Sequence, residues 1–212
     1  MKKKHSLLLC VQVFTLFLCA QAQDHVITWD ADTLQCIFPD KPRKEGVKPG
    51  SKYENGHIRL LAHFENDSIR VIEAGDIKGY SRKKHGKSLL CDGVFESVEV
   101  TEQEQRYIYS GRNDGKRWYF LNRIFSGKYA SLYVMYISRT SGPPSPFYFV
   151  RKMDHEKIKP VLLRNWKQVF DYLYDPVIST DFKAENYKGK QKNYLHIVKE
   201  YNRLKERVSK NQ

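Results

Sequence analysis

The sequence predicts an α+β fold, in which a mostly antiparallel β-sheet of short hairpins is followed by two C-terminal amphipathic helices that pack on the sheet. Between residues 25 and 153, short runs of β-branched and aromatic residues alternate with turn signals rich in Gly, Asp and Asn. After residue 160, apolar residues recur at helical spacing instead. We therefore expect a single α+β domain over residues 23–212, β-rich over 25–153 and helical over 160–208.

The first 22 residues have the features of a secretory signal peptide. Three lysines at positions 2–4 precede an apolar run over residues 7–18, and Ala20-Gln21-Ala22 supplies the small residues of a cleavage site. We expect cleavage after Ala22, which makes the periplasm, the outer-membrane periphery or the medium the expected location. The apolar run is too short to favour a membrane span, and no later segment is apolar enough to cross a bilayer.

Two other interpretations of this leader remain open. The segment could be retained as an N-terminal anchor. Cys19 also follows the apolar run, as in a lipoprotein signal, but Leu18 stands where that cleavage needs a small residue. We therefore prefer the ordinary cleavage, with lipidation as the minor alternative.

The chain is strongly basic and contains few cysteines. Loss of the three leader lysines lowers its formal net charge from +13 to +10. In a cytosolic protein this charge would favour nucleic acid as a partner, whereas export argues against it and favours anionic glycans or lipid headgroups. Beyond the leader only Cys36 and Cys91 remain. Either a disulfide or two buried free thiols fits their apolar surroundings.

Paired apolar runs predict the hairpins of the sheet. The expected strand pairs are residues 25–29 with 33–38, 57–65 with 68–74, 76–82 with 87–95, 106–110 with 116–125, and 129–138 with 146–153. The turn Asp114-Gly115 is the strongest hairpin signal in the chain. Residues 39–56 are rich in Pro and Gly, and we expect an exposed loop there.

The hairpin of residues 129–138 and 146–153 is expected to lie in the core, because its first strand is apolar on both faces. Amphipathic helices are predicted over residues 161–175 and 188–208, where apolar side chains follow one helical stripe. These helices provide the cover that one face of the central hairpin requires.

Catalytic and metal-binding signatures are sparse. The chain has no Gly-rich phosphate loop, no nucleophile elbow and no paired-cysteine metal spacing, so we expect no metal or other cofactor. His57 and His63 would share a strand face, but two ligands make a weak metal site. A hydrolase remains the alternative function, because carboxylates are frequent in the middle of the chain: Asp76, Asp92, Glu96, Glu99, Glu102 and Glu104.

The segment over residues 106–123 is the better candidate for binding, because basic and aromatic residues alternate along it. Aromatic rings stack on sugar faces, and guanidinium groups hold anionic oxygens. Alternation in a two-sided hairpin, with aromatic residues inward and basic residues outward, would produce the same pattern. The candidate binding residues are Tyr107, Tyr109, Arg112, Arg117, Trp118 and Tyr119.

The stretches "FLNRIFSGKYASLYV", "FYFVRK" and "YLHIVKEYN" resemble a group of uncharacterised secreted or envelope β-rich proteins of Bacteroidetes-type bacteria. The matching motifs are Asp32-Thr33, Gly79-Tyr80, and Gly127-Lys128 followed by Leu132-Tyr133. The resemblance implies an envelope or secreted location and no assigned reaction. Such bacteria O-glycosylate exported proteins at Asp-Ser/Thr followed by an apolar residue, which makes Thr33 and Ser68 candidate glycosylation sites.

Export, a β-rich body and the mixed aromatic and basic residues together predict an exported envelope protein. We expect a non-catalytic binding or structural module whose partner is an envelope glycan, a lipid or a protein. The alternative is a hydrolase that acts on an envelope polysaccharide or peptidoglycan through its carboxylates. The missing catalytic motifs favour the first interpretation over an enzyme.

Overall fold

The computed structural model describes residues 24–38, 59–66, 68–83, 93–108, 118–137, 145–153, 160–187 and 193–210. The expected leader, the loop predicted over 39–56 and the predicted residues Tyr109, Arg112 and Arg117 lie outside this described part. Cys91 and Asp92 also lie outside it.

Within the described part, ten strands form one antiparallel sheet in the order β10-β9-β8-β7-β6-β5-β1-β2-β3-β4. The strands are β1 (His25–Ile27), β2 (Thr33–Ile37), β3 (Arg59–Phe64), β4 (Ile69–Glu73), β5 (Gly79–Arg82), β6 (Gly93–Glu99), β7 (Trp118–Ser126), β8 (Ala130–Ile137), β9 (Ser145–Lys152) and β10 (Val161–Leu162). The helices are α2 (Glu102–Ile108), α3 (Gln168–Tyr172), the 3-10 helix η1 (Ala184–Tyr187) and α4 (Tyr194–Lys210). The predicted α+β class is confirmed.

Most of the expected hairpins are present. Strands β1 and β2 pair, as do β3 with β4, β5 with β6, and β8 with β9. The prediction for β8 is confirmed in detail, because residues 130–135 are buried on both faces of the sheet. On one face β8 and β9 contribute to a core with α3 and α4, which includes Leu132, Val150 and Tyr201.

The strand predicted over residues 106–110 is wrong, because α2 ends at Ile108. A reciprocal cap starts this helix: the Glu104 carboxylate accepts from the Thr101 backbone N–H at 2.8 Å, and Thr101 Oγ1 accepts from the Glu104 N–H at 3.2 Å. This arrangement is a capping box, which satisfies two backbone donors at the start of a helix. Strand β7 pairs with β6, whereas the predicted pairing with residues 106–108 is replaced by α2.

The helix predicted over residues 161–175 is much shorter than expected. Its first residues form β10, which extends the sheet beside β9, and only α3 is helical. Asn165 begins the turn before α3, because its carboxamide oxygen accepts from the backbone N–H groups of Lys167 and Gln168. The last predicted helix is present as α4 and carries one buried stripe that includes Ile197 and Leu204.

The Asn202 side chain of helix α4 makes several hydrogen bonds to the β7–β8 turn. Asn202 Oδ1 accepts from the backbone N–H groups of Tyr129 and Ala130 at 2.8 and 3.2 Å. Asn202 Nδ2 donates to the carbonyl oxygens of Ala130 and Val198 at 3.0 and 2.9 Å. The turn leaves no room for a larger residue at position 127, since a Cβ on Gly127 would collide with Asn202 Oδ1.

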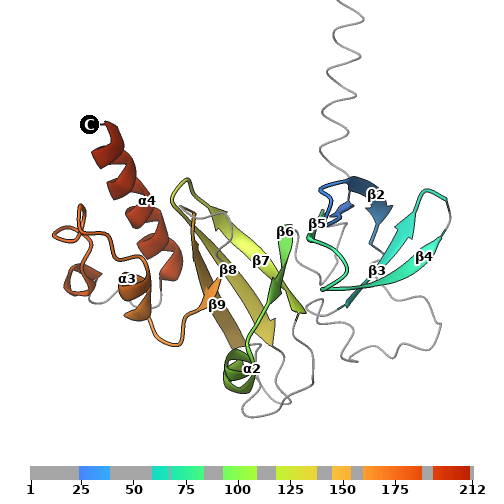
Figure 1. Ribbon diagram of the computed structural model, residues 1–212, viewed down its shortest axis with the longest axis horizontal. Coiled ribbons are helices and arrows are strands. Elements are labelled where there is room, and N and C mark those ends of the chain that lie inside the picture. The colour runs from blue at the N-terminus through green and yellow to red at the C-terminus, as the bar shows by residue number, and fades with distance from the viewer. Residues whose placement is uncertain are drawn as a thin grey trace, which may run out of the picture.

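The two ends of the sheet are covered differently. In Figure 1, α3 and α4 lie beside β8 and β9, whereas β2, β3 and β4 lie at the opposite end of the molecule. At that opposite end the strands enclose a separate core that includes Val26, Phe38, Ala62 and Tyr80. A third core lies under α2 and includes Tyr119 and Phe149.

Candidate functional site

The three predicted binding residues that the structure describes, Tyr107, Trp118 and Tyr119, do not lie together on one surface. Trp118 and Tyr119 are neighbours on β7, so their side chains lie on opposite faces of the sheet. Tyr119 is completely buried, and its hydroxyl accepts from Gln105 Nε2 at 3.0 Å. Tyr107 lies on α2, where its hydroxyl donates to the Arg164 carbonyl at 3.1 Å and the Arg164 guanidinium lies 5.6 Å from its ring centre.

Trp118 is partly buried and instead forms a pair with the exposed Trp29. The two ring centroids are 5.4 Å apart with an interplanar angle of 71°, which is an edge-to-face contact. Trp29 is 48% exposed, and its indole Nε1–H donates to the Gly75 carbonyl at 3.0 Å. The Trp29 indole is therefore held by both a ring contact and a hydrogen bond, while about half of its surface faces solvent.

Gly75 is part of this site because it allows the Trp118 indole to lie against the backbone. A Cβ at position 75 would lie 3.2 Å from Trp118 Cδ1, closer than ordinary van der Waals contact. The turn is closed from both sides, because the Asp76 N–H donates to the Glu73 carbonyl and the Glu73 N–H donates to the Asp76 carboxylate, each at 3.0 Å. The turn thus fixes the Gly75 carbonyl that holds Trp29.

The turn that carries Trp29 is also strained. Ala31 has a φ of 67°, and it is the non-glycine residue with positive φ in the part of the chain that the structure describes. That conformation costs an Ala residue about 1–2 kcal/mol. Hydrogen bonds from the Ala31 and Asp32 N–H groups to Thr28 hold the turn in place. Backbone strain of this kind is concentrated at functional sites.

Together, Trp29, Trp118 and Gly75 form what we call the tryptophan platform. Glu99 lies directly opposite Trp118 in the β6–β7 register, and directly paired residues share a sheet face. A carboxylate on the same face can accept hydrogen bonds from hydroxyl groups of a bound molecule. The sequence prediction included Trp118 but missed Trp29, although an aromatic residue at the edge of the turn Asp30-Ala31-Asp32 was a signal for exposure.

Among the described carboxylates proposed for a hydrolase, Glu96, Glu102 and Glu104 each have a structural partner. Glu96 contacts two arginines, Arg123 and Arg151, and Glu104 caps α2. Glu102 is exposed and pairs with Arg106 at 3.8 Å. Glu96 and Glu99 are three residues apart on one strand, which places them on opposite faces of the sheet.

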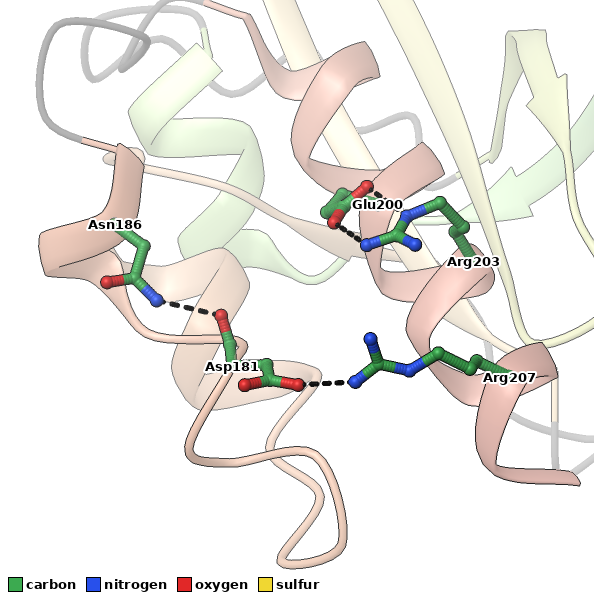
Figure 2. Close-up of polar contacts among 5 residues, drawn as sticks. All are labelled: Asp181, Asn186, Glu200, Arg203 and Arg207. Carbon is green, nitrogen blue, oxygen red and sulfur yellow. Dashed lines mark hydrogen bonds and ion pairs between the residues drawn. The ribbon is translucent and has the colours of Figure 1, made fainter. Parts of the chain in front are cut away.

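Another polar group links α4 to the segment before it. Figure 2 shows the Asp181 carboxylate facing Arg207, while the Asp181 carbonyl accepts from Asn186, and the Glu200 carboxylate facing Arg203. The Asp181–Arg207 contact is 2.7 Å, and Arg203 bonds Glu200 through Nε and Nη2 at 2.8 and 2.6 Å. The Asp181–Arg207 pair joins α4 to the preceding segment, but both side chains are more than half exposed, so it adds little stability. The Glu200–Arg203 pair lies within α4 itself.

The remaining predicted residues have clear locations. Thr33 is exposed at the start of β2, and Ser68 is half-buried with its hydroxyl donating to Asn66. Cys36 is a buried free thiol, and its pKa is raised to about 12 by burial and by the nearby Asp24 carboxylate. This thiol therefore remains protonated at neutral pH and is a poor nucleophile.

The described part of the chain has neither a metal-binding cluster nor a membrane-spanning helix. No cluster of three or more His, Cys, Asp or Glu side chains there has an arrangement that could hold a metal ion. Among the helices described, none is both long and apolar enough to cross a membrane. Comparisons with protein-family models, curated proteins and solved structures gave no match to this chain.

Proposed function

We propose that the protein is an exported, non-catalytic binding module that recognises a glycan through the tryptophan platform. The observation that carries this proposal is the half-exposed indole of Trp29, which is fixed by Trp118 and by the Gly75 carbonyl. An aromatic ring presents a flat apolar face that fits the C–H face of a sugar ring. Because the ring is already held in place, binding loses little side-chain entropy.

A glycan fits this site better than a lipid or a protein partner. A sugar needs both a stacking surface and hydrogen-bond acceptors for its hydroxyl groups. Glu99 lies next to the platform, on the same sheet face as Trp118. The turns beside Trp29 also carry Asp30 and Asp76, both of which are exposed. This local acidity favours a neutral sugar over an anionic one, since like charges repel.

The first experiment measures binding of the purified protein to arrayed oligosaccharides of neutral hexoses and N-acetylhexosamines. For an oligosaccharide that binds, Trp29→Ala should weaken the affinity about tenfold or more, as expected for an aromatic residue at the centre of a contact. Gly75→Ala should also weaken it, because the new methyl group displaces the Trp118 ring. Tyr174→Ala is the matched control, since Tyr174 is 62% exposed and lies outside the platform.

Unchanged affinity in Trp29→Ala would exclude the platform as the glycan site. An equal loss in Tyr174→Ala would show that the effect is not specific. Release of shortened products from the bound oligosaccharide would contradict the non-catalytic part of the proposal and favour the hydrolase.

Export is a separate part of the proposal and rests on the leader sequence. N-terminal sequencing of the protein from the envelope and the culture medium should begin at Gln23. Recovery of the intact leader, or of lipid attached to Cys19, would replace ordinary cleavage with an anchored form.

A further inference from the structure

On the face of the sheet opposite Trp118, three charged side chains from three strands meet. Arg123 Nη1 lies 2.8 Å from Glu96 Oε1, and Arg151 Nη1 lies 2.9 Å from Glu96 Oε2. The register places them together, because Arg123 is directly opposite Tyr133, and Arg151 is opposite Ser131 on the same strand. We call Arg123, Arg151 and Glu96 the arginine cluster.

The arginine cluster has an excess of positive charge in a partly desolvated place. Two guanidinium groups share a single carboxylate, which leaves a formal charge of +1 on the three side chains. The side chains of Arg123, Glu96 and Arg151 are only 30%, 19% and 21% exposed. A charge in such surroundings interacts more strongly with a counter-ion than a charge in bulk water does.

The guanidinium groups are also held in position before any ligand arrives. The Arg151 guanidinium lies 5.3 Å from the Tyr133 ring centre, and the Tyr133 hydroxyl donates to Glu96 Oε2 at 3.1 Å. Burial and the nearby Glu96 raise the pKa of Tyr133, so its hydroxyl keeps the proton that it donates. Each arginine uses one Nη atom on Glu96, and a guanidinium has further N–H donors for a second acceptor.

We propose that the arginine cluster binds an oxyanion, either a phosphate or a carboxylate group, which adds a second acceptor to the two guanidinium groups. Paired guanidinium groups on rigid strands match the geometry of such oxygens. Helix α2 covers the same face only farther along the strands, where Gln105 contacts Tyr119. This site is independent of the tryptophan platform, which lies on the other face.

The experiment titrates the purified protein with inorganic phosphate at constant ionic strength, with sodium chloride as the balancing salt. Backbone amide chemical shifts on β6, β7 and β9 should change saturably with phosphate. A parallel titration with glucuronate distinguishes a carboxylate ligand from a phosphate. Arg151→Gln and Arg123→Gln should each lower the affinity for the preferred probe about tenfold, as expected for a lost charge-assisted hydrogen bond.

Two further variants separate binding from a structural role. Arg106→Gln removes the same charge from α2, where the side chain is 68% exposed, and it should leave the affinity unchanged. Glu96→Gln removes the internal anion and should increase the affinity several-fold, because the cluster charge rises to +2. A purely structural cluster would lose stability in Glu96→Gln with no gain in affinity.

The proposal is overturned if neither phosphate nor glucuronate produces a saturable shift. It is also overturned if the affinity survives in a folded Arg123→Gln, Arg151→Gln double variant, with folding checked by circular dichroism. Arg151→Lys provides a second test, because it keeps the charge but loses the planar fork, and it should retain only part of the affinity.

Discussion

The two ends of the sheet bury their apolar side chains in different ways. At the β8–β9 end, α3 and α4 cover one face, and the core between them contains Leu132, Val150, Phe170 and Tyr201. At the β2–β4 end, the strands themselves enclose Phe38, Ala62 and Ile72.

This difference in cover leaves different surfaces exposed. At the β2–β4 end, Ile37, Ile69 and Val71 are 65%, 52% and 62% exposed. At the other end, residues 130–135 of β8 are buried on both faces. The comparison shows that helical cover, and not strand hydrophobicity alone, decides whether both faces of a strand are buried.

The largest expected effect is at the helix-covered end. Tyr201→Ala should lower the free energy of unfolding by about 3–5 kcal/mol, because it opens a cavity between α4 and the sheet. Urea denaturation measures the change. Tyr174→Ala, an exposed tyrosine before α4, should stay within about 0.5 kcal/mol of the parent protein. Similar losses in both variants would show that α4 is not the main cover of this end.

The next effect concerns the contact between α4 and the β7–β8 turn. Asn202→Ala should cost about 2–3 kcal/mol, since it leaves the Tyr129 and Ala130 N–H groups without their acceptor. Asn202→Asp keeps the acceptor but places an anion against the Ala130 carbonyl, so it should also destabilise. Glu206→Ala on the exposed face of α4 is the control. Thermal unfolding of Asn202→Ala at the same midpoint temperature as the parent protein would contradict this role.

The two ends should also differ in their response to alkaline pH. Burial raises the pKa of Cys36 from 9.0 to about 12 and that of Tyr187 from 10.0 to about 12. Above the unfolded-state pKa the unfolded chain releases the proton and the folded chain keeps it, so stability falls as pH rises. Cys36→Ala should remove the loss of folding stability that begins near pH 9. Tyr187→Phe should remove the loss of folding stability that begins near pH 10.

Urea denaturation between pH 8 and 11 measures these losses. Each variant should show a shallower decline in stability with pH than the parent protein. A decline of the same slope in the Cys36→Ala variant would mean that this thiol ionises equally in the folded and unfolded chains.

The smallest effect is expected on the outer face of β4. Val71→Ala should change the free energy of unfolding by about 0.5 kcal/mol or less, because Val71 is already exposed. Its neighbour Ile72 points into the core at the same end, and Ile72→Ala should cost about 2–5 kcal/mol. Equal costs for these adjacent residues, measured by urea denaturation, would mean that the outer face of β4 is also packed.

Much of the sheet could be predicted because local patterns carried the information. The continuous apolar run of β8 and the turn signals beside β1 and β3 depend on neighbours in sequence. The prediction for residues 106–110 was wrong because it relied on the alternation of basic and aromatic residues there. The capping box of Thr101 and Glu104, which starts a helix, was not taken into account. Residues 161–162 form a strand because β9 has an open edge beside them, which is tertiary information.

The candidate site was less predictable than the fold. Trp29, Gly75 and Trp118 are far apart in the chain and meet only because β1 and β5 lie beside β6 and β7. In the same way, the arginine cluster depends on the register of four strands. The alternation around Trp118 indicated that aromatic residues were present but not which face each would occupy.

The most direct test of the account uses the indole N–H resonances of Trp29, Trp118 and Trp166, the tryptophans of the chain. During titration with a bound neutral oligosaccharide, the Trp29 and Trp118 resonances should shift together. Trp166 packs against Phe170 at the other end of the sheet and should stay unchanged. A bound oligosaccharide that leaves the Trp29 resonance unmoved, or shifts Trp166 equally, would contradict glycan recognition by the tryptophan platform.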